Sequence, residues 1–480
     1  MVQTFARGAP GVLLVRLLMI AAVAFVALVA RPAAAQSILR DAETEALLRD
    51  ASAPLIQAAG LRPQDVRLVL IHDDSINAFV AGGQIVYIHS GLLTRADNLN
   101  EVQGVIAHEL GHVVGGHIIR STEGIQQATS ISILSLIIGA AAMLAGAGPA
   151  GAAIMGLGQQ VAMSQFLAFT RTQESSADQA GASYLARAGI SGRGSLEFFG
   201  KLQNMEFRYN IPQENSYQRT HPLNSERMAA LENSYRNDPA WDTPTPPALE
   251  ARFQRIRAKL AGYVDEPERV FHRYPESDQS VPARYARAYA WHRSAHPDRA
   301  LAAAESLLAE APHDAYFLEL KGQILLESGR PDEALAALRE AVARSRNEPL
   351  IASIFGHALI ATEDPGNFEE AERVLRTVVQ RDHENPFAWY QLGVVYDRKG
   401  DIGRASLATA ERYSLMRQPQ LAMVSAQNAM AGIPTGTPDW IRAQDILMVS
   451  RNEIERRGRR NRRATDTPAA PVAPRSIFQY

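Results

Sequence analysis

The sequence predicts a mostly helical α+β domain with a small β-sheet, followed by an all-α array of repeated helix pairs. Two strand-like segments precede a helix that carries the pattern H-E-x-x-H, and together they predict the first domain. Prolines that recur at a fixed interval in the helical second half predict the second. The chain has 480 residues, a length that accommodates several domains.

The composition excludes several classes of function. The formal net charge of −2 argues against a general nucleic-acid binder. The chain has 0 cysteines, so it has no disulfide framework, no thiolate metal site and no thiol nucleophile. Any metal must therefore be held by histidine and carboxylate side chains.

Residues 1–35 resemble a cleaved signal peptide. Arg7 and Arg16 provide a basic start, 17–30 is apolar, and small residues precede Gln36. A retained membrane anchor is the alternative, but the apolar core is short for a span. We therefore expect an exported protein, which in a bacterium with two membranes means the periplasm, where it could lie peripherally at the outer membrane.

The first domain, 36–262, begins with helix and strand patterns. An amphipathic helix is expected at 37–57, strands at 66–71 and 84–88, and a turn at Ala81-Gly82-Gly83 between the strands. The helix that carries the motif is expected at 98–116. A strand of the small sheet could present its edge to an extended peptide. Further helices are expected at 171–188, 194–206 and 224–235, with loops at 212–222 and 239–247.

No charged residue or histidine occurs between Gly124 and Thr170. The simplest interpretation is a buried helical pair packed on the motif helix. A hairpin that dips into a membrane or closes over the site as a lid is a second interpretation, and a transmembrane hairpin is a third. Glycines interrupt the run and glutamines weaken its second half, which argues against a full span.

The second domain, 263–420, is repetitive. Pro312, Pro349 and Pro386 stand 37 residues apart, and Pro419 follows 33 residues later. This is close to the period of tetratricopeptide repeats, which stack into a superhelix with a concave binding face. A helical cap is expected at 421–455. The segment 456–480 is rich in arginine and then in proline and alanine, which indicates a disordered tail, with attraction to anionic lipid or an acidic partner as the alternative.

The motif His108-Glu109-Leu110-Gly111-His112 predicts a zinc site. Residues four apart on a helix lie about 40° apart around its axis, so both imidazoles project from one face and can bind one ion. Glu109 is placed to act as the base toward the water that the ion activates. His117 lies about 180° around the helix from His108, so we reject it as the third ligand and expect an outer-sphere or exposed histidine.

Glu174 is the expected third metal ligand. It lies four residues before Asp178, so the two carboxylates share one helical face. Asp178 can accept the ring N–H of a ligand histidine and fix its tautomer. Downstream, His221 could donate to the oxyanion or occupy the open position on zinc, and Arg227 could pair with a carboxylate of the site.

These motifs, with Asn77-Ala78-Phe79 and Gly91-Leu92 before them, resemble the M48 family of zinc metallopeptidases. The resemblance implies a zincin-like (gluzincin) fold and one Zn²⁺ held by His108, His112 and Glu174, with Glu109 as the base. It also implies a zinc metalloendopeptidase. Periplasmic members of this family are implied to handle misassembled outer-membrane proteins, with their repeats contacting the assembly machinery.

The expected function is therefore degradation of misfolded or stalled outer-membrane proteins and assistance to barrel assembly. The expected partners are such proteins as substrates, the assembly machinery through the repeats, and a membrane surface through 124–170; nucleic acid is not expected. Two alternatives stay open. One is a repeat-based chaperone or scaffold with a largely silenced protease, and the other is an integral membrane protease.

Overall fold

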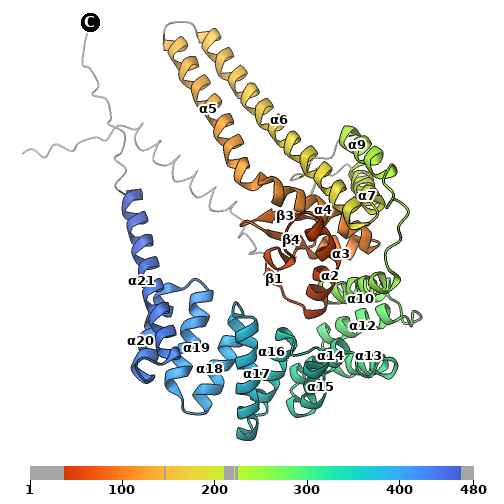
Figure 1. The fold of residues 1–480 in the computed structure, drawn as a ribbon, viewed down its shortest axis with the longest axis vertical. Helices are drawn as coiled ribbons and strands as arrows, with labels where there is room; N and C mark the ends of the chain where they lie inside the picture. Colours follow the sequence, from red (N-terminus) through yellow and green to blue (C-terminus); the bar gives the residue numbers. More distant parts are fainter. Residues whose placement is uncertain (1–36, 145–147, 210–220, 222–224, 466–480) are drawn as a thin grey trace, which may run out of the picture. The chain divides into compact units, whose positions relative to one another are not determined.

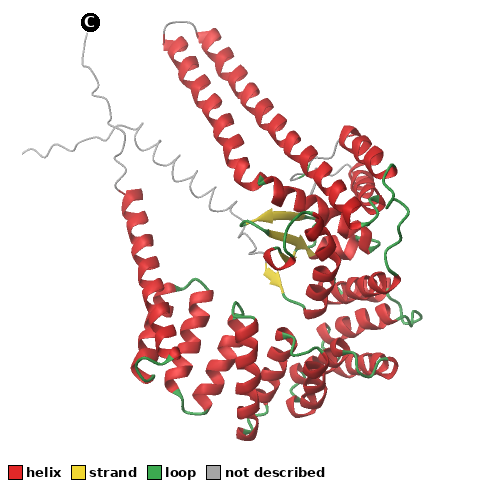
Figure 2. Cartoon of the chain, viewed as in Figure 1, coloured by secondary structure: helices red, strands yellow, loops and turns green. Residues whose placement is uncertain are grey.

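The computed structural model describes residues 37–144, 148–209, 221 and 225–465 (Figure 1). The expected signal peptide, most of the loop at 212–222 and the last part of the tail lie outside these residues. Helices dominate the described chain, and strands occur only near its start (Figure 2). The expected class, a small sheet within a mostly helical domain followed by helical repeats, is confirmed.

The sheet combines a parallel and an antiparallel pair. β2 (Arg67–His72) lies parallel to β4 (Ile85–His89), and β3 (Ala78–Ala81) lies antiparallel to β4 at the edge of the sheet. A further short strand is β1 (Ser37–Leu39). The turn from β3 to β4 uses Gly82 and Gly83 with φ of 64° and 100°, a conformation that glycine adopts without steric cost.

The first helix, α2 (Ala42–Ala58), begins five residues later than the expected 37. Asp41 caps it by accepting a hydrogen bond from the Thr44 amide at 2.8 Å, which satisfies one of the free N–H groups of the first turn. The apolar face of α2 joins β2, β3 and β4 in one buried core, through Leu47, Leu55, Val86 and Ile88 among others.

The helix that carries the motif, α4 (Leu99–Gly115), follows the short α3 (Ser90–Arg95). Asn98 caps its start, and Gly116 ends it with φ of 61°, the left-handed conformation typical of helix termination. Most of α4 is buried among the sheet, α6 and α7, so its motif is set in a rigid core. The expected bounds, 98–116, match these caps.

The uncharged stretch forms a long hairpin, not a buried pair. α5 (His117–Leu144) and α6 (Gly148–Ala188) lie side by side and extend away from the sheet (Figure 1). Many large apolar side chains of the hairpin are exposed, so the simplest interpretation from the sequence is wrong. A separate helix from 171 is also wrong, because α6 is continuous from the hairpin to the residues that follow it. One helix in the described chain, Ile119–Met143, is long and apolar enough to cross a membrane.

Several shorter helices complete the first half. They are α7 (Arg193–Tyr209), α9 (Ser225–Arg236), α10 (Pro247–Val264) and α11 (Pro267–Arg273), with a 3₁₀ turn η1 (Pro63–Asp65) before β2.

The repeats form antiparallel helix pairs, and three of the four expected prolines start helices, whereas Pro312 lies in the turn before the helix that starts at Ala315. Pro349, Pro386 and Pro419 each occupy the first position of a helix, where a missing N–H costs nothing. The helices are α12 (Val281–Arg293), α13 (Pro297–Glu310), α14 (Ala315–Glu327), α15 (Pro331–Arg344), α16 (Pro349–Ala361), α17 (Phe368–Arg381), α18 (Pro386–Arg398), α19 (Ile402–Leu415), α20 (Pro419–Gly432) and α21 (Pro438–Thr465), with η2 (Pro365–Asn367) between α16 and α17.

The helix α21 runs ten residues into the stretch that we expected to be a disordered tail from 456. Arg457 pairs with Glu453, and Arg459 pairs with Glu455, each one helical turn apart. Such pairs stabilise an exposed helix, and both residue types are good helix formers.

A buried charged cluster links the first half to the repeats within one compact unit, Leu39–Tyr480. Lys259 of α10 pairs with Asp41 and, at 3.4 Å, with Glu43 of α2. The Tyr285 hydroxyl of α12 donates to Glu43 at 2.9 Å. Because these groups are buried, removing one partner would leave a buried charge uncompensated and destabilise the fold.

Candidate metal centre

The buried face of α4 presents His108 and His112. Their Nε2 atoms lie 3.1 Å apart, and the residues are 3% and 8% exposed. The four-residue spacing places both rings on the side that faces α6. The structure therefore brings together the two histidines that the motif predicts as ligands.

Glycines allow α6 to approach α4 closely enough to supply a third group. A Cβ on Gly111 would lie 2.6 Å from the Ala177 carbonyl oxygen, and one on Gly181 would lie 3.1 Å from the Ala107 backbone. This close packing places the Glu174 carboxylate 3.4 Å from Nε2 of both His108 and His112.

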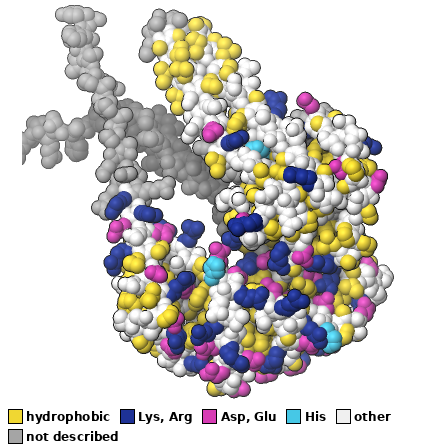
Figure 3. All heavy atoms as spheres, viewed as in Figure 1, with side chains coloured by type: hydrophobic (Ala, Val, Ile, Leu, Met, Phe, Trp, Pro, Cys, Tyr) yellow, Lys and Arg dark blue, Asp and Glu magenta, His cyan; other side chains and the backbone are white. Residues whose placement is uncertain are grey.

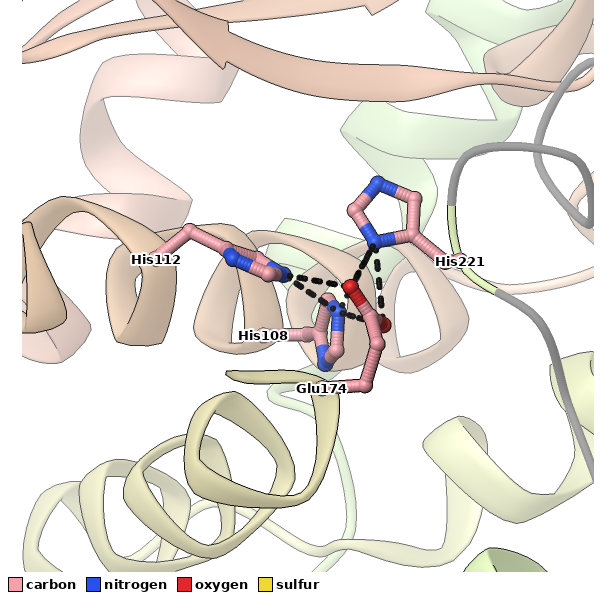
Figure 4. Close-up of side chains that lie close together, drawn as sticks. All are labelled: His108, His112, Glu174 and His221. Carbon is pink, nitrogen blue, oxygen red and sulfur yellow. Dashed lines mark hydrogen bonds and ion pairs between the residues drawn. The ribbon is translucent and has the colours of Figure 1, made fainter. Parts of the chain in front are cut away.

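His221 completes a four-residue cluster. Its Nδ1 lies 3.2 Å from both Glu174 oxygens and 3.3 Å from His108 Nε2 (Figure 4). One candidate ligand atom from each of His108, His112, Glu174 and His221 lies within 4.8 Å of the others. The His221 ring thus points into the cluster as a ligand does, although His221 lies far from the motif in the sequence.

Asp178 and Arg227 support the cluster from behind. The His108 Nδ1–H donates to Asp178 at 2.9 Å, which orients the ring with Nε2 toward the cluster. Arg227 donates to both Asp178 oxygens at 2.7 and 2.9 Å and lies 3.2 Å from Glu174. The guanidinium therefore holds two carboxylates in fixed orientations. Asp178 contacts a predicted ligand but is not itself in the ligand set.

His117 contacts a predicted ligand from the start of α5. Its Nδ1 lies 2.9 Å from His112 Nδ1, and the residue is 5% exposed. A Cβ on Gly115 would lie 2.4 Å from the His117 ring, so the glycine leaves room for this contact. The structure thus places His117 against His112. The sequence feature that could have indicated this contact is Gly115, two residues before His117.

Phe199 of α7 was not anticipated as part of the site. Its ring meets His108 edge-on, with centroids 6.4 Å apart. The residue is 2% exposed and closes the apolar side of the cluster. No pattern in the sequence distinguishes it from Phe198, because adjacent aromatic residues are common in buried helices.

The pKa values in the cluster reflect burial opposed by close charges. Burial would lower the pKa of His108, but hydrogen bonds to Asp178 and Glu174 raise it to about 10. Burial lowers the pKa of His112 to about 4, which keeps that imidazole neutral and its lone pair available. Burial would raise the pKa of Glu174, but hydrogen bonds from the surrounding histidines hold it well below its usual range. Together, the Glu174 and Asp178 carboxylates stabilise a positive charge at the centre of the histidine cluster.

Glu109 is fully buried beside the cluster. Among the described residues its carboxylate oxygens find no hydrogen-bond partner, and His221 Nε2 lies 3.5 Å from one of them. Burial raises its pKa. A buried carboxylate without such partners is costly unless a cation or a bound water lies beside it. The donor set of two or three imidazoles and one carboxylate suits a divalent transition metal, so the residues fit a metal ion.

Comparison with known proteins agrees with this geometry. The model of peptidase family M48 matches residues 39–235, and a tetratricopeptide-repeat model matches 283–349 and 364–414. The M48 match includes both motif histidines, Glu174 and His221. The chain therefore contains an M48 peptidase domain followed by C-terminal tetratricopeptide repeats, and its general class is a metalloprotease.

Two curated proteins that bear the same name are similar to this chain over about three quarters of their length. The beta-barrel assembly-enhancing protease of Yersinia pestis is 26% identical over 381 residues, which cover 78% of this chain and 76% of that protein. The protein of that name from Escherichia coli (strain K12) is 24% identical over 379 residues, 77% of this chain and 75% of that protein. Metalloprotease LoiP of the same organism is 29% identical over 177 residues, 37% of this chain and 65% of that protein.

Proposed function

We propose that this chain, which joins an M48 peptidase domain to tetratricopeptide repeats, is a periplasmic zinc-dependent endopeptidase that degrades misfolded or stalled outer-membrane proteins and assists the assembly of outer-membrane barrels. The observation that carries the proposal is the buried set of His108, His112 and Glu174 with Glu109 beside it. The names of the relatives support the barrel-assembly role.

Each residue of the site has a role in peptide hydrolysis. His108, His112 and Glu174 would hold one Zn²⁺, which when bound supplies a Lewis acid toward water and the scissile carbonyl. Glu109 accepts the proton of the attacking water and passes it to the leaving amine, a transfer that its raised pKa favours. Asp178 holds the His108 tautomer, and Arg227 holds Asp178.

His221 decides whether the site can react. A catalytic zinc site keeps one open position, whereas four protein ligands close it. With Nδ1 of His221 directed into the cluster, we propose that this arrangement is latent and that His221 must leave before substrate binds. The alternative role, donation to the oxyanion, requires the ring to lie beside the reacting carbonyl.

The edge strand β3 offers a place for an extended substrate. β3 pairs with β4 on one side only, and it packs near α4. An extended peptide added to this edge gains backbone hydrogen bonds that do not depend on its sequence. This suits substrates that are unfolded and varied.

The decisive experiment replaces Glu109 with glutamine. We expect Glu109→Gln to retain zinc, measured by elemental analysis, and to lose hydrolysis of an unfolded outer-membrane protein by at least about a hundredfold, as expected for loss of a general base. Glu232→Gln, on the exposed face of α9, serves as the matched control and should keep full activity. Full hydrolysis by a zinc-loaded Glu109→Gln variant would refute the mechanism.

A repeat-based scaffold is the second candidate function. α17, α18, α19 and α21 line a pocket with the side chains of Arg376, Trp389 and Tyr396 among others, which suits a protein segment. We propose that the assembly machinery contacts the repeats there. If His108→Ala still restored barrel assembly in cells that lack the protein, scaffolding would be the main function and proteolysis secondary.

A further inference from the structure

The outer half of the α5–α6 hairpin is an apolar surface that no described segment covers. On α5, Ile133, Leu134 and Ile137 are 52%, 58% and 61% exposed. On α6, Leu157 is 61% exposed. Figure 3 shows hydrophobic side chains gathered over this end of the hairpin, while charged side chains are spread over the rest of the visible face. Exposed apolar surface of this kind indicates a binding partner.

The exposed side chains surround α5 instead of forming one stripe. At 100° per residue, the exposed apolar positions between Ile133 and Ile138 span about 200° of the helix circumference. The remaining arc faces α6. A protein groove covers a single stripe of a docked helix, whereas lipid surrounds a helix on every side that a neighbouring helix leaves open.

The contact between the two helices uses the small and polar residues. A Cβ on Gly139 would lie 2.7 Å from the Gly151 carbonyl oxygen, so the backbones nearly touch. The Ser132 hydroxyl donates to Gln159 across the pair at 3.3 Å. Large apolar side chains that face outward, with glycine backbones in close contact between the helices, are the arrangement of helices packed in lipid and the reverse of a hairpin in water.

Length and polarity limit how far the hairpin can enter. Ile131–Met143 contains only two polar side chains and extends about 20 Å at 1.5 Å per residue. On α6 the apolar segment Pro149–Leu157 is shorter, because Gln159 and Gln160 follow. One leaflet of a bilayer contributes about 15 Å of hydrocarbon, and a full core is about 30 Å. The apolar length therefore matches one leaflet.

We propose that the outer half of this hairpin, Ile131–Met143 with Pro149–Leu157, inserts into one leaflet of a lipid bilayer. Because α6 is a single helix, Glu174 lies 17 residues beyond Leu157, or about 25 Å along the axis. The hairpin would hold the metal site at that distance above the membrane surface. This inference depends on the hairpin alone, so it can fail or succeed independently of the proteolytic function.

The cysteine-free chain permits a local test. A single cysteine at Ile137, labelled with an environment-sensitive nitrobenzoxadiazole dye, reports insertion at that site only. With vesicles of phosphatidylethanolamine and phosphatidylglycerol we expect a several-fold rise and blue shift in emission that persist in high salt, because the outer half of the hairpin carries no charge. A local dye also separates insertion of the hairpin from vesicle binding by any other apolar part of the protein.

Two control positions separate the hairpin from the rest of the protein. Dyes at Gln126→Cys, near the base of α5, and at Leu421→Cys, an exposed apolar position in the repeats, should respond weakly or not at all. Replacing both Leu134 and Ile138 with glutamine in the Ile137→Cys protein should weaken the response at least tenfold. These positions are exposed, so the fold should tolerate the change, which circular dichroism checks.

Several outcomes would overturn the proposal. No response to vesicles at Ile137 would refute insertion. A response to an unfolded polypeptide but not to vesicles would assign the surface to protein substrates, and a rise with protein concentration in the absence of lipid would assign it to a second copy. A dye at Met143→Cys should be quenched by probes placed at the bilayer centre. Quenching by iodide trapped inside the vesicles would instead show a full span.

Discussion

At the scale of single residues, the candidate metal site depends on the groups that hold the predicted ligands in place. Asp178 accepts a hydrogen bond from the Nδ1–H of His108 and is itself held by Arg227. Burial alone would raise the pKa of Asp178, but these two contacts lower it below its usual value. The carboxylate therefore stays ionised and selects the tautomer whose Nε2 can bind a metal. Because Glu174 and Asp178 lie four residues apart on α6, one helix supplies both a predicted ligand, Glu174, and the carboxylate that orients His108.

Replacing Asp178 with asparagine should weaken metal binding. The amide keeps the shape of the side chain but loses the charge that favours the His108 tautomer, so we expect a loss of about 10- to 100-fold in metal affinity. Competition with a chelator of known affinity measures it. Asp242→Asn, whose side chain is 82% exposed, should leave the affinity unchanged. Equal affinities for the two variants would show that Asp178 does not act on the metal.

Replacing His221 with alanine tests the latent arrangement. If His221 closes the site, the variant should retain the metal on three ligands and hydrolyse a short reporter peptide several-fold faster than the unaltered protein. If His221 instead serves the oxyanion, kcat should fall while KM changes little. The comparison of kcat and KM therefore decides between the two roles.

At the scale of secondary-structure elements, close packing of α4 against α6 builds the centre. The crossing brings Gly111 and Gly181 to the opposite backbones, and neither helix has room for a side chain at these points. The contact fixes the distance from the motif histidines to Glu174. A shift of α6 by a few tenths of an ångström would therefore change the distances within the cluster of candidate ligands directly.

Gly111→Ala should destabilise both the fold and the site. Its methyl group would lie 2.6 Å from the Ala177 carbonyl, so the helices must separate, at a cost of about 1–3 kcal/mol, with weaker metal binding. Denaturant unfolding and metal titration measure the two effects. Gly200→Ala in α7, where no atom lies within 4 Å of the new Cβ, should be neutral or stabilising. Similar losses for both variants would contradict this explanation.

At the scale of the whole molecule, buried charges join the peptidase domain to the repeats. Lys259 reaches Asp41 and Glu43 of α2 from α10, and Tyr285 of the first repeat helix reaches the same Glu43. Burial opposes the charged form of Lys259, but the neighbouring acids and tyrosines hold its pKa well above its usual value. Such a cluster favours one packing of the two halves over others.

Lys259→Met should destabilise the protein by about 3–5 kcal/mol, because it leaves Asp41 without its buried cation and Glu43 with Arg255 alone. The midpoint of denaturant unfolding measures the loss. Lys321→Met, which removes an exposed pair with Glu305, should cost less than about 1 kcal/mol. A small effect at Lys259 would mean that water reaches the cluster and shields the acids.

Glu319 makes the stability of the repeats depend on pH. Burial raises the pKa of this carboxyl to about 8. The positive charge of Lys259 lowers the pKa and the negative charge of Asp41 raises it, but burial has the largest effect. The folded state therefore holds its proton between pH 4.5 and about 8, where the unfolded state has lost it, so stability falls as pH rises through this range. Glu319→Gln should thus raise the melting temperature more at pH 8 than at pH 5. An equal shift at both values would show that Glu319 is not buried in its neutral form.

Much of the site could be predicted because its geometry is local. The positions of His108, Glu109 and His112 on one helical face follow from their spacing alone, as do those of Glu174 and Asp178. The period of the prolines likewise predicted the repeats, since Pro349, Pro386 and Pro419 each start a helix and Pro312 lies in the turn just before one. β3 was missed because its four residues are too short to show a strand pattern before the turn.

The sequence by itself indicated the candidate ligands, the candidate base, the helix that carries the motif and the repeat architecture, because local spacing sets the angle between side chains on one helix. Only the tertiary structure decided that His221 enters the ligand cluster, that His117 supports His112, and that the uncharged hairpin is exposed instead of buried. These features depend on which segments meet across long stretches of chain. An apolar stretch has the same pattern whether protein or lipid covers it, and only the packing around it shows which side chains protein leaves bare.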